Sequence, residues 1–141
     1  MPYREKTAWL ALISIVVAFV PYFAIVAARQ TDGSSASDVR QLALFAVAAV
    51  AQVLILAVGT IILARTAPHD AQVPPDERDR SIVQRSTNIA YYVLISGVIV
   101  VGCVMPFTYS GWPIINAALL AIVIAEITRY GVVAVSYRRQ A

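Results

Sequence analysis

Residues 76–129 read DERDRSIVQRSTNIAYYVLISGVIVVGCVMPFTYSGWPIINAALLAIVIAEITR. Within them, the forty residues Ser86–Ala125 carry no charged side chain. One membrane-crossing helix needs about 20 apolar residues, so this run is long enough for two crossings. The segment Met105–Pro113 interrupts it with two prolines and a glycine. The sequence therefore predicts a helical hairpin that crosses a bilayer twice and returns both charged ends to one membrane face.

The rest of the chain adds two further apolar runs. Of its 141 residues, 60 % are hydrophobic and 13 % are charged, which is far more apolar than soluble proteins are. We expect a single transmembrane domain over residues 1–141, with an all-α fold: an integral-membrane four-helix bundle. The expected spans are residues 8–28, 42–64, 87–108 and 112–135.

The first apolar run is expected to stay in the mature protein. Trp9–Ala28 has the length of a full span, whereas a signal peptide has a shorter apolar core. Pro21 should bend this helix, because its ring removes one backbone hydrogen bond. Gln30–Asp38 is a loop by composition, and Ser37 or Asp38 is suited to cap the next helix.

The third long helix has a charged beginning. Pro74 and Pro75 prevent a helix from continuing through the preceding loop, and Asp76 is suited to the N-cap. A helix from about residue 76 to Pro106 is longer than a bilayer requires. Its first turns are therefore expected to project as a cytoplasmic stub, formed by Asp76, Glu77, Arg78, Asp79 and Arg80. Either this stub docks a partner, or it is a solvated helix start whose acids match the helix dipole.

Lysine and arginine counts predict the orientation in the membrane. Two lie at the N-terminus, four in residues 65–85 and three at the C-terminal end, whereas the opposite face has only Arg29 and Arg40. Because positive residues favour the cytoplasmic side, both termini are predicted to be cytoplasmic.

Glu126 is the most informative candidate site residue. It follows Trp112 by 14 residues, which at about 1.5 Å per residue places it about 21 Å into a hydrocarbon core about 30 Å thick. An ionisable group at that depth should face protein or water. Either Glu126 binds a proton or cation, or it forms an ion pair with Arg129, which lies three residues on.

The hairpin suggests further members of this polar network. If the turn centres near residues 109–110, facing residues have numbers that add to about 219. Glu126 then lies opposite about Val93, and Arg129 opposite about Ala90. The predicted intramembrane network consists of Glu126, Arg129, Asn88, Tyr91 and Tyr92.

The residue inventory argues against several functional classes. Cys103 is the only cysteine and His69 the only histidine, so the chain has neither a thiol pair nor a zinc or two-histidine haem ligand set. We identify no catalytic residues, no metal site and no cofactor, and expect no enzyme activity. The net charge of +3 arises at span ends, so we expect no nucleic-acid binding.

At residues 76–92, DERDRSIVQRSTNIAYY, the chain resembles a family of small bacterial membrane proteins of unknown function. These have about four predicted spans and an acidic-Glu-Arg-Asp motif before the third, which Glu77, Arg78 and Asp79 match. The resemblance implies the bacterial inner (cytoplasmic) membrane and transfers no site role. Small multidrug transporters also have four spans, but their membrane glutamate lies in the first. The expected first span here has no acid.

Two functions from different classes follow. The first is a non-enzymatic accessory or regulatory membrane protein, which displays its charged stub and C-terminal arginines to a cytoplasmic or membrane protein partner. The alternative is a small proton-coupled transporter or channel that uses Glu126.

A chain of this size has little room for a pathway, and an alanine-rich second span permits close helix packing. We therefore expect a homodimer in the lipid bilayer.

Overall fold

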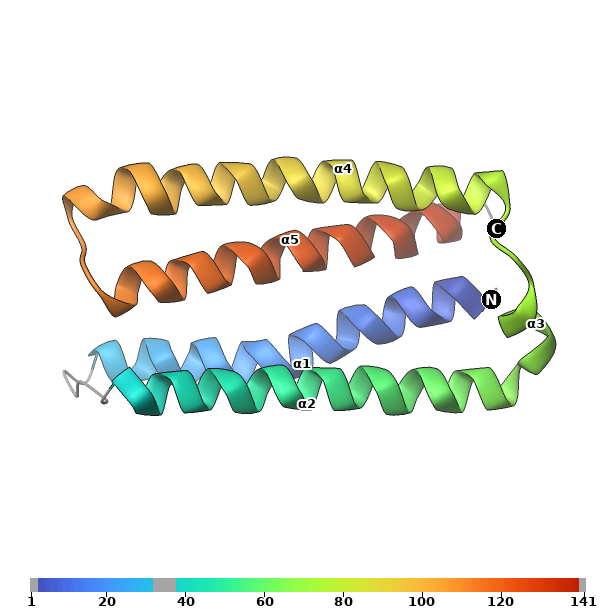
Figure 1. Cartoon of the computed structure of the whole chain (residues 1–141), viewed down its shortest axis with the longest axis horizontal. Helices are drawn as coiled ribbons and strands as arrows, with labels where there is room; N and C mark the ends of the chain where they lie inside the picture. The colour runs from blue at the N-terminus through green and yellow to red at the C-terminus, as the bar shows by residue number, and fades with distance from the viewer. Residues whose placement is uncertain (1–2, 32–37, 140–141) are drawn as a thin grey trace.

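The computed structural model describes residues 3–31 and 38–139, and helices are the only regular secondary structure there (Figure 1). The elements are α1 (Tyr3–Thr31), α2 (Asp38–Thr66), α3 (Pro68–Gln72), α4 (Glu77–Ile99), a π-helical segment (Val100–Val104), a 3₁₀ turn (Met105–Phe107) and α5 (Trp112–Arg139). Four helices are long and apolar enough to cross a membrane: α1, α2, α4 with its extension to Phe107, and α5. The all-α prediction and the number of candidate spans are thus confirmed for the described residues.

The four long helices lie in the order α2, α1, α5, α4 (Figure 1). Within the described chain, the extensive contacts join α2 to α1, α1 to α5, and α5 to α4. The outer helices α2 and α4 therefore do not close the structure around a central axis. The sequence predicts a four-helix bundle, whereas the described helices form an open layer, which leaves most of α2 and α4 exposed for contact with lipid.

Aromatic and polar contacts join three helices at the end of the layer away from the chain termini. The Tyr22 ring packs against Phe45 of α2, with centroids 5.7 Å apart. The Tyr22 hydroxyl donates a hydrogen bond to Asn116 Oδ1 at 2.8 Å, and Asn116 Nδ2 donates to Gln41 Oε1 at 3.2 Å. Buried polar groups need such partners, so these contacts link α1, α5 and α2. Near this region, α1 changes direction (Figure 1), as expected from Pro21 within it.

The α4–α5 hairpin has the expected alignment. A Cβ atom on Gly97 would lie 2.7 Å from the Ala121 Cβ, so these two residues face each other directly. Their numbers add to 218, against the expected value of about 219. In the turn, Gly111 has φ of +70°, a conformation that glycine adopts without steric cost.

The alanines of α2 are partly used within the chain. Ala48 is buried and Ala49 packs against the same cluster, which α1 and α5 complete. Close packing of α2 is therefore satisfied in part by α1. Ser37 and most of the Gln30–Asp38 loop lie outside the described residues, while Asp38 is the first residue of α2.

Candidate functional site

The beginning of α4 is a capped helix end. The Asp76 carboxylate accepts a hydrogen bond from the Glu77 backbone N–H at 2.7 Å, and Asp79 Oδ2 accepts one from the Asp76 backbone N–H at 3.3 Å. The Asp79 contact and a hydrogen bond from the Asp79 backbone N–H to the Asp76 side chain form a reciprocal capping box, which satisfies backbone donors that the first turn leaves unpaired. The expected N-cap role of Asp76 is present, so this end of α4 has a defined structure.

Asp79 joins three helices. Its Oδ2 atom lies 3.2 Å from Arg4 Nε of α1, and its Oδ1 atom accepts a hydrogen bond of 2.6 Å from the Tyr137 hydroxyl of α5. Arg4 also donates to the Val73 carbonyl oxygen at 3.3 Å. A nearby cation and a donated hydrogen bond both favour the ionised carboxylate. The contacts of Asp79 with Arg4 and Tyr137 therefore link α1, α4 and α5, and we call them the Asp79 contact site.

Apolar side chains pack beside the Asp79 contact site. One buried cluster consists of Ala8, Ile82, Val133, Ala134 and Tyr137. The partly buried Trp9 of α1 packs against this cluster. The beginning of α4 therefore lies against α1 and α5. The sequence predicts a cytoplasmic stub here, but it does not predict this packing against α1 and α5.

The residues expected to form the docking stub divide into two groups. Asp79 is occupied by internal contacts, and Asp76 remains exposed while it caps the helix. Glu77, Arg78 and Arg80 are exposed. Apart from the capping residue Asp76, the outward-facing charges of this helix end are therefore one acid and two bases.

The expected intramembrane network is brought together only in part. Glu126 Oε2 lies 3.8 Å from Arg129 Nη1, and their side chains remain 43 % and 38 % exposed. Asn88, Tyr91 and Tyr92 are exposed on α4, and the two tyrosine rings contact each other, with centroids 6.0 Å apart. The hydrogen bonds and ion pairs of the described residues do not connect these three side chains to Glu126.

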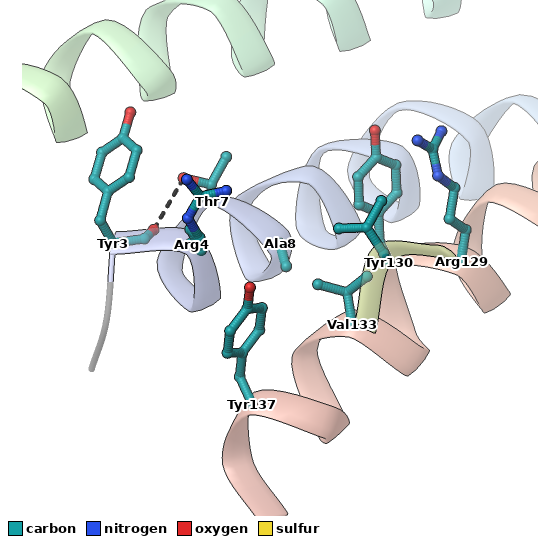
Figure 2. Close-up of a pocket in the computed structure, with 9 residues that line it drawn as sticks. Tyr3, Arg4, Thr7, Ala8, Arg129, Tyr130, Val133 and Tyr137 are labelled. Carbon is teal, nitrogen blue, oxygen red and sulfur yellow. Dashed lines mark hydrogen bonds between the residues drawn. The ribbon is translucent and has the colours of Figure 1, made fainter. Parts of the chain in front are cut away.

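A cavity of about 290 Å³ lies beside the Asp79 contact site, and Arg4 and Tyr137 are among its lining residues. Helices α1 and α5 provide most of its lining (Figure 2). Val83 of α4 completes it. In Figure 2, Tyr3 and Arg4 lie at one end of the row of labelled side chains and Arg129 lies at the other. The other lining residues are Tyr3, Thr7, Ala8, Tyr130 and Val133. Cationic and hydroxyl groups thus share one cavity with apolar walls.

Three residues at this end of the molecule have contacts or burial that the sequence did not predict: Arg4, Glu5 and Tyr137. The hairpin alignment places Asp79 opposite about residue 140, within one turn of Tyr137, so it contained a signal for that contact. No comparable local signal pairs Arg4 with Asp79. Glu5, which preceded the expected first span, lies in the first turn of α1 and is only 2 % exposed.

The described residues contain no cluster of three or more histidine, cysteine, aspartate or glutamate side chains suited to a metal ion. A protein-family model described as "Predicted membrane protein (DUF2178)" matches residues 4–141 of the chain. No curated protein and no solved structure matches the chain.

Proposed function

The chain belongs to DUF2178, a family of predicted membrane proteins, and from this premise we propose that it is a non-enzymatic accessory protein of the bacterial inner membrane. Both termini and the beginning of α4 face the cytoplasm in this proposal. There the exposed charges of α4, together with Arg138 and Arg139, bind a cytoplasmic or membrane protein partner.

The proposal rests on the Asp79 contact site, which holds the beginning of α4 in place. Contacts with Arg4 and Tyr137 hold the first turn of α4 against α1 and α5, while Glu77 and Arg80 remain exposed. A charged group held on a fixed helix end loses less side-chain and backbone freedom on binding than one on a mobile segment. This geometry favours recognition by a partner over a purely solvating role.

In-cell cross-linking followed by affinity purification tests the docking role. The variant Glu77→Gln/Arg80→Gln removes one charge of each sign, so the net charge of the chain is unchanged. The control is Arg40→Gln, which lies near the beginning of α2, at the end of the layer away from the beginning of α4 (Figure 1). We expect the α4 variant to lose specific partners that the wild type and the control retain. Identical partner profiles for all three proteins would rule out this helix end as the docking element.

The Glu126–Arg129 pair supports a second candidate function, proton-coupled transport. It lies in a candidate membrane span, and its contact of 3.8 Å is long for a fixed ion pair. The helices of one chain form an open layer, so an enclosed pathway would require a second copy.

Ion flux in proteoliposomes separates the two candidates. Under an imposed pH gradient, a transporter should carry out pH-dependent flux that Glu126→Gln abolishes without unfolding the protein. The accessory role predicts no flux for either protein. Flux in the wild type that this substitution removes would replace the accessory role with transport.

A further inference from the structure

We propose that the cavity between α1 and α5 binds the phosphate group of an anionic phospholipid, with Arg129 as its main ligand-binding residue. This site is separate from the exposed face that docks a protein partner. The proposal rests on three properties of the cavity: an incompletely paired guanidinium, a second guanidinium with hydroxyl groups, and apolar walls.

Arg129 has unused hydrogen-bonding capacity. A guanidinium group carries five N–H donors. Within the described chain, Arg129 makes one ionic contact of 3.8 Å with Glu126, beyond hydrogen-bond distance, and its Cζ atom lies 5.5 Å from the centroid of the Tyr130 ring. These contacts leave most of its N–H donors without a hydrogen-bond acceptor in the described chain. A phosphate oxyanion can accept two of them in parallel, which is the geometry that arginine favours.

The rest of the cavity suits a lipid better than a free anion. Arg4 uses Nε and one Nη2 donor in its contacts with Asp79 and Val73, so three of the five N–H donors of its guanidinium are not used in these contacts. Ala8 and Val133 provide apolar walls between the two arginines (Figure 2). The volume of about 290 Å³ is close to the lower limit of ligand pockets, roughly 300 Å³. That space suits a headgroup and the first part of its apolar chain.

The position of the cavity agrees with this ligand. It lies among the first turns of α1 and the second half of α5, at the end of the layer where both chain termini lie (Figure 1). Basic pockets between membrane helices on the cytoplasmic side bind anionic headgroups. The orientation predicted from arginine and lysine counts places this cavity on that side.

Competitive lipid retention, measured by native mass spectrometry, tests the site. Detergent-solubilised protein is mixed with equal amounts of phosphatidylglycerol, which is anionic, and phosphatidylcholine, which is zwitterionic. The variants are Arg129→Gln and Glu126→Gln, and the control is Arg138→Gln, an exposed arginine outside the cavity. A parallel arm adds excess inorganic phosphate to distinguish a lipid from a free anion.

We expect the wild type and Arg138→Gln to retain phosphatidylglycerol preferentially. Arg129→Gln should reduce that preference by about tenfold, the effect of losing a charge-assisted hydrogen bond. Glu126→Gln should retain at least as much as the wild type, because it removes the competing carboxylate. Excess inorganic phosphate should not displace the lipid.

Three outcomes would overturn the proposal: no preference in the wild type, equal retention by Arg129→Gln, or displacement of the lipid by inorganic phosphate. If Arg129→Gln does not fold, Arg129→Lys replaces it. That variant keeps the charge but lacks the bidentate fork, so it should show a smaller loss in the same direction. Retention equal to the wild type in Arg129→Lys would then also contradict the assignment.

Discussion

Asp79 shows how one carboxylate can serve local and long-range structure together. Its Oδ2 atom accepts from the backbone N–H of Asp76 and contacts Arg4, while Oδ1 accepts from Tyr137. The local contact follows from the spacing of residues at a helix beginning. The two long-range contacts depend on how α1 and α5 pack, and they turn a helix cap into a connection between three helices.

Tyr137→Phe isolates one of these long-range contacts. The substitution keeps the ring that packs in the buried cluster and removes only the hydroxyl donor. Hydrogen bonds to charged groups contribute about 1.5–3 kcal/mol. Since the Asp79 side chain is 19 % exposed, water can replace part of the contact, and we expect a loss of about 1–2 kcal/mol. Thermal unfolding in detergent measures this loss as a lower midpoint temperature.

Tyr109→Phe is the matched control for that experiment. Tyr109 is exposed in the turn before α5, and the side-chain hydrogen bonds of the described residues do not involve its hydroxyl. Its substitution should leave the unfolding midpoint unchanged. Equal midpoints for the Tyr137 and Tyr109 variants would show that the hydroxyl contact with Asp79 contributes nothing to stability.

At the scale of the elements, the α4–α5 hairpin depends on close approach of its two helices. Gly97 faces Ala121 so closely that an added Cβ would lie 2.7 Å from the Ala121 Cβ. The lack of a side chain at Gly97 therefore sets how near the helices can pack. Gly102, in the π-helical segment, has open space where its Cβ would lie.

Gly97→Ala should therefore destabilise the hairpin, although alanine is the better helix former. The new methyl group must separate the helices, and overpacking of this kind costs about 1–3 kcal/mol. Gly102→Ala adds the same methyl group without a neighbour and should be neutral or stabilising. Unfolding of the two variants under identical detergent conditions gives the comparison. A Gly97→Ala protein as stable as the Gly102→Ala protein would contradict the hairpin alignment.

At the scale of the whole molecule, hydrophobic patterning predicted more than polar patterning did. Forty uncharged residues and a turn segment were enough for the α4–α5 hairpin and its alignment to within one residue. The order of the helices was not accessible, because apolar residues in a membrane span face lipid and protein alike. The polar N-terminal residues look like a solvated end in the sequence, so their contact with Asp79 and the burial of Glu5 required the packed structure.

The open layer also bears on assembly. Since α2 packs mainly against α1 and α4 mainly against α5, both outer faces are available to lipid or to a second copy. We propose a homodimer, and mass-calibrated size analysis in mild detergents and in nanodiscs should give two chains per particle. A single chain per particle in all of these conditions would exclude the dimer.

The proposed docking role requires that the chain ends and the beginning of α4 share the cytoplasmic side. Single-cysteine labelling from each side of the membrane decides this, in a Cys103→Ser background because Cys103 is exposed. We predict that Lys6→Cys and Arg80→Cys react with an impermeant reagent from the cytoplasmic side only, and that Ser110→Cys reacts from the opposite side only. Reaction of Ser110→Cys from the cytoplasmic side would contradict both the crossing of the α4–α5 hairpin and the proposed orientation.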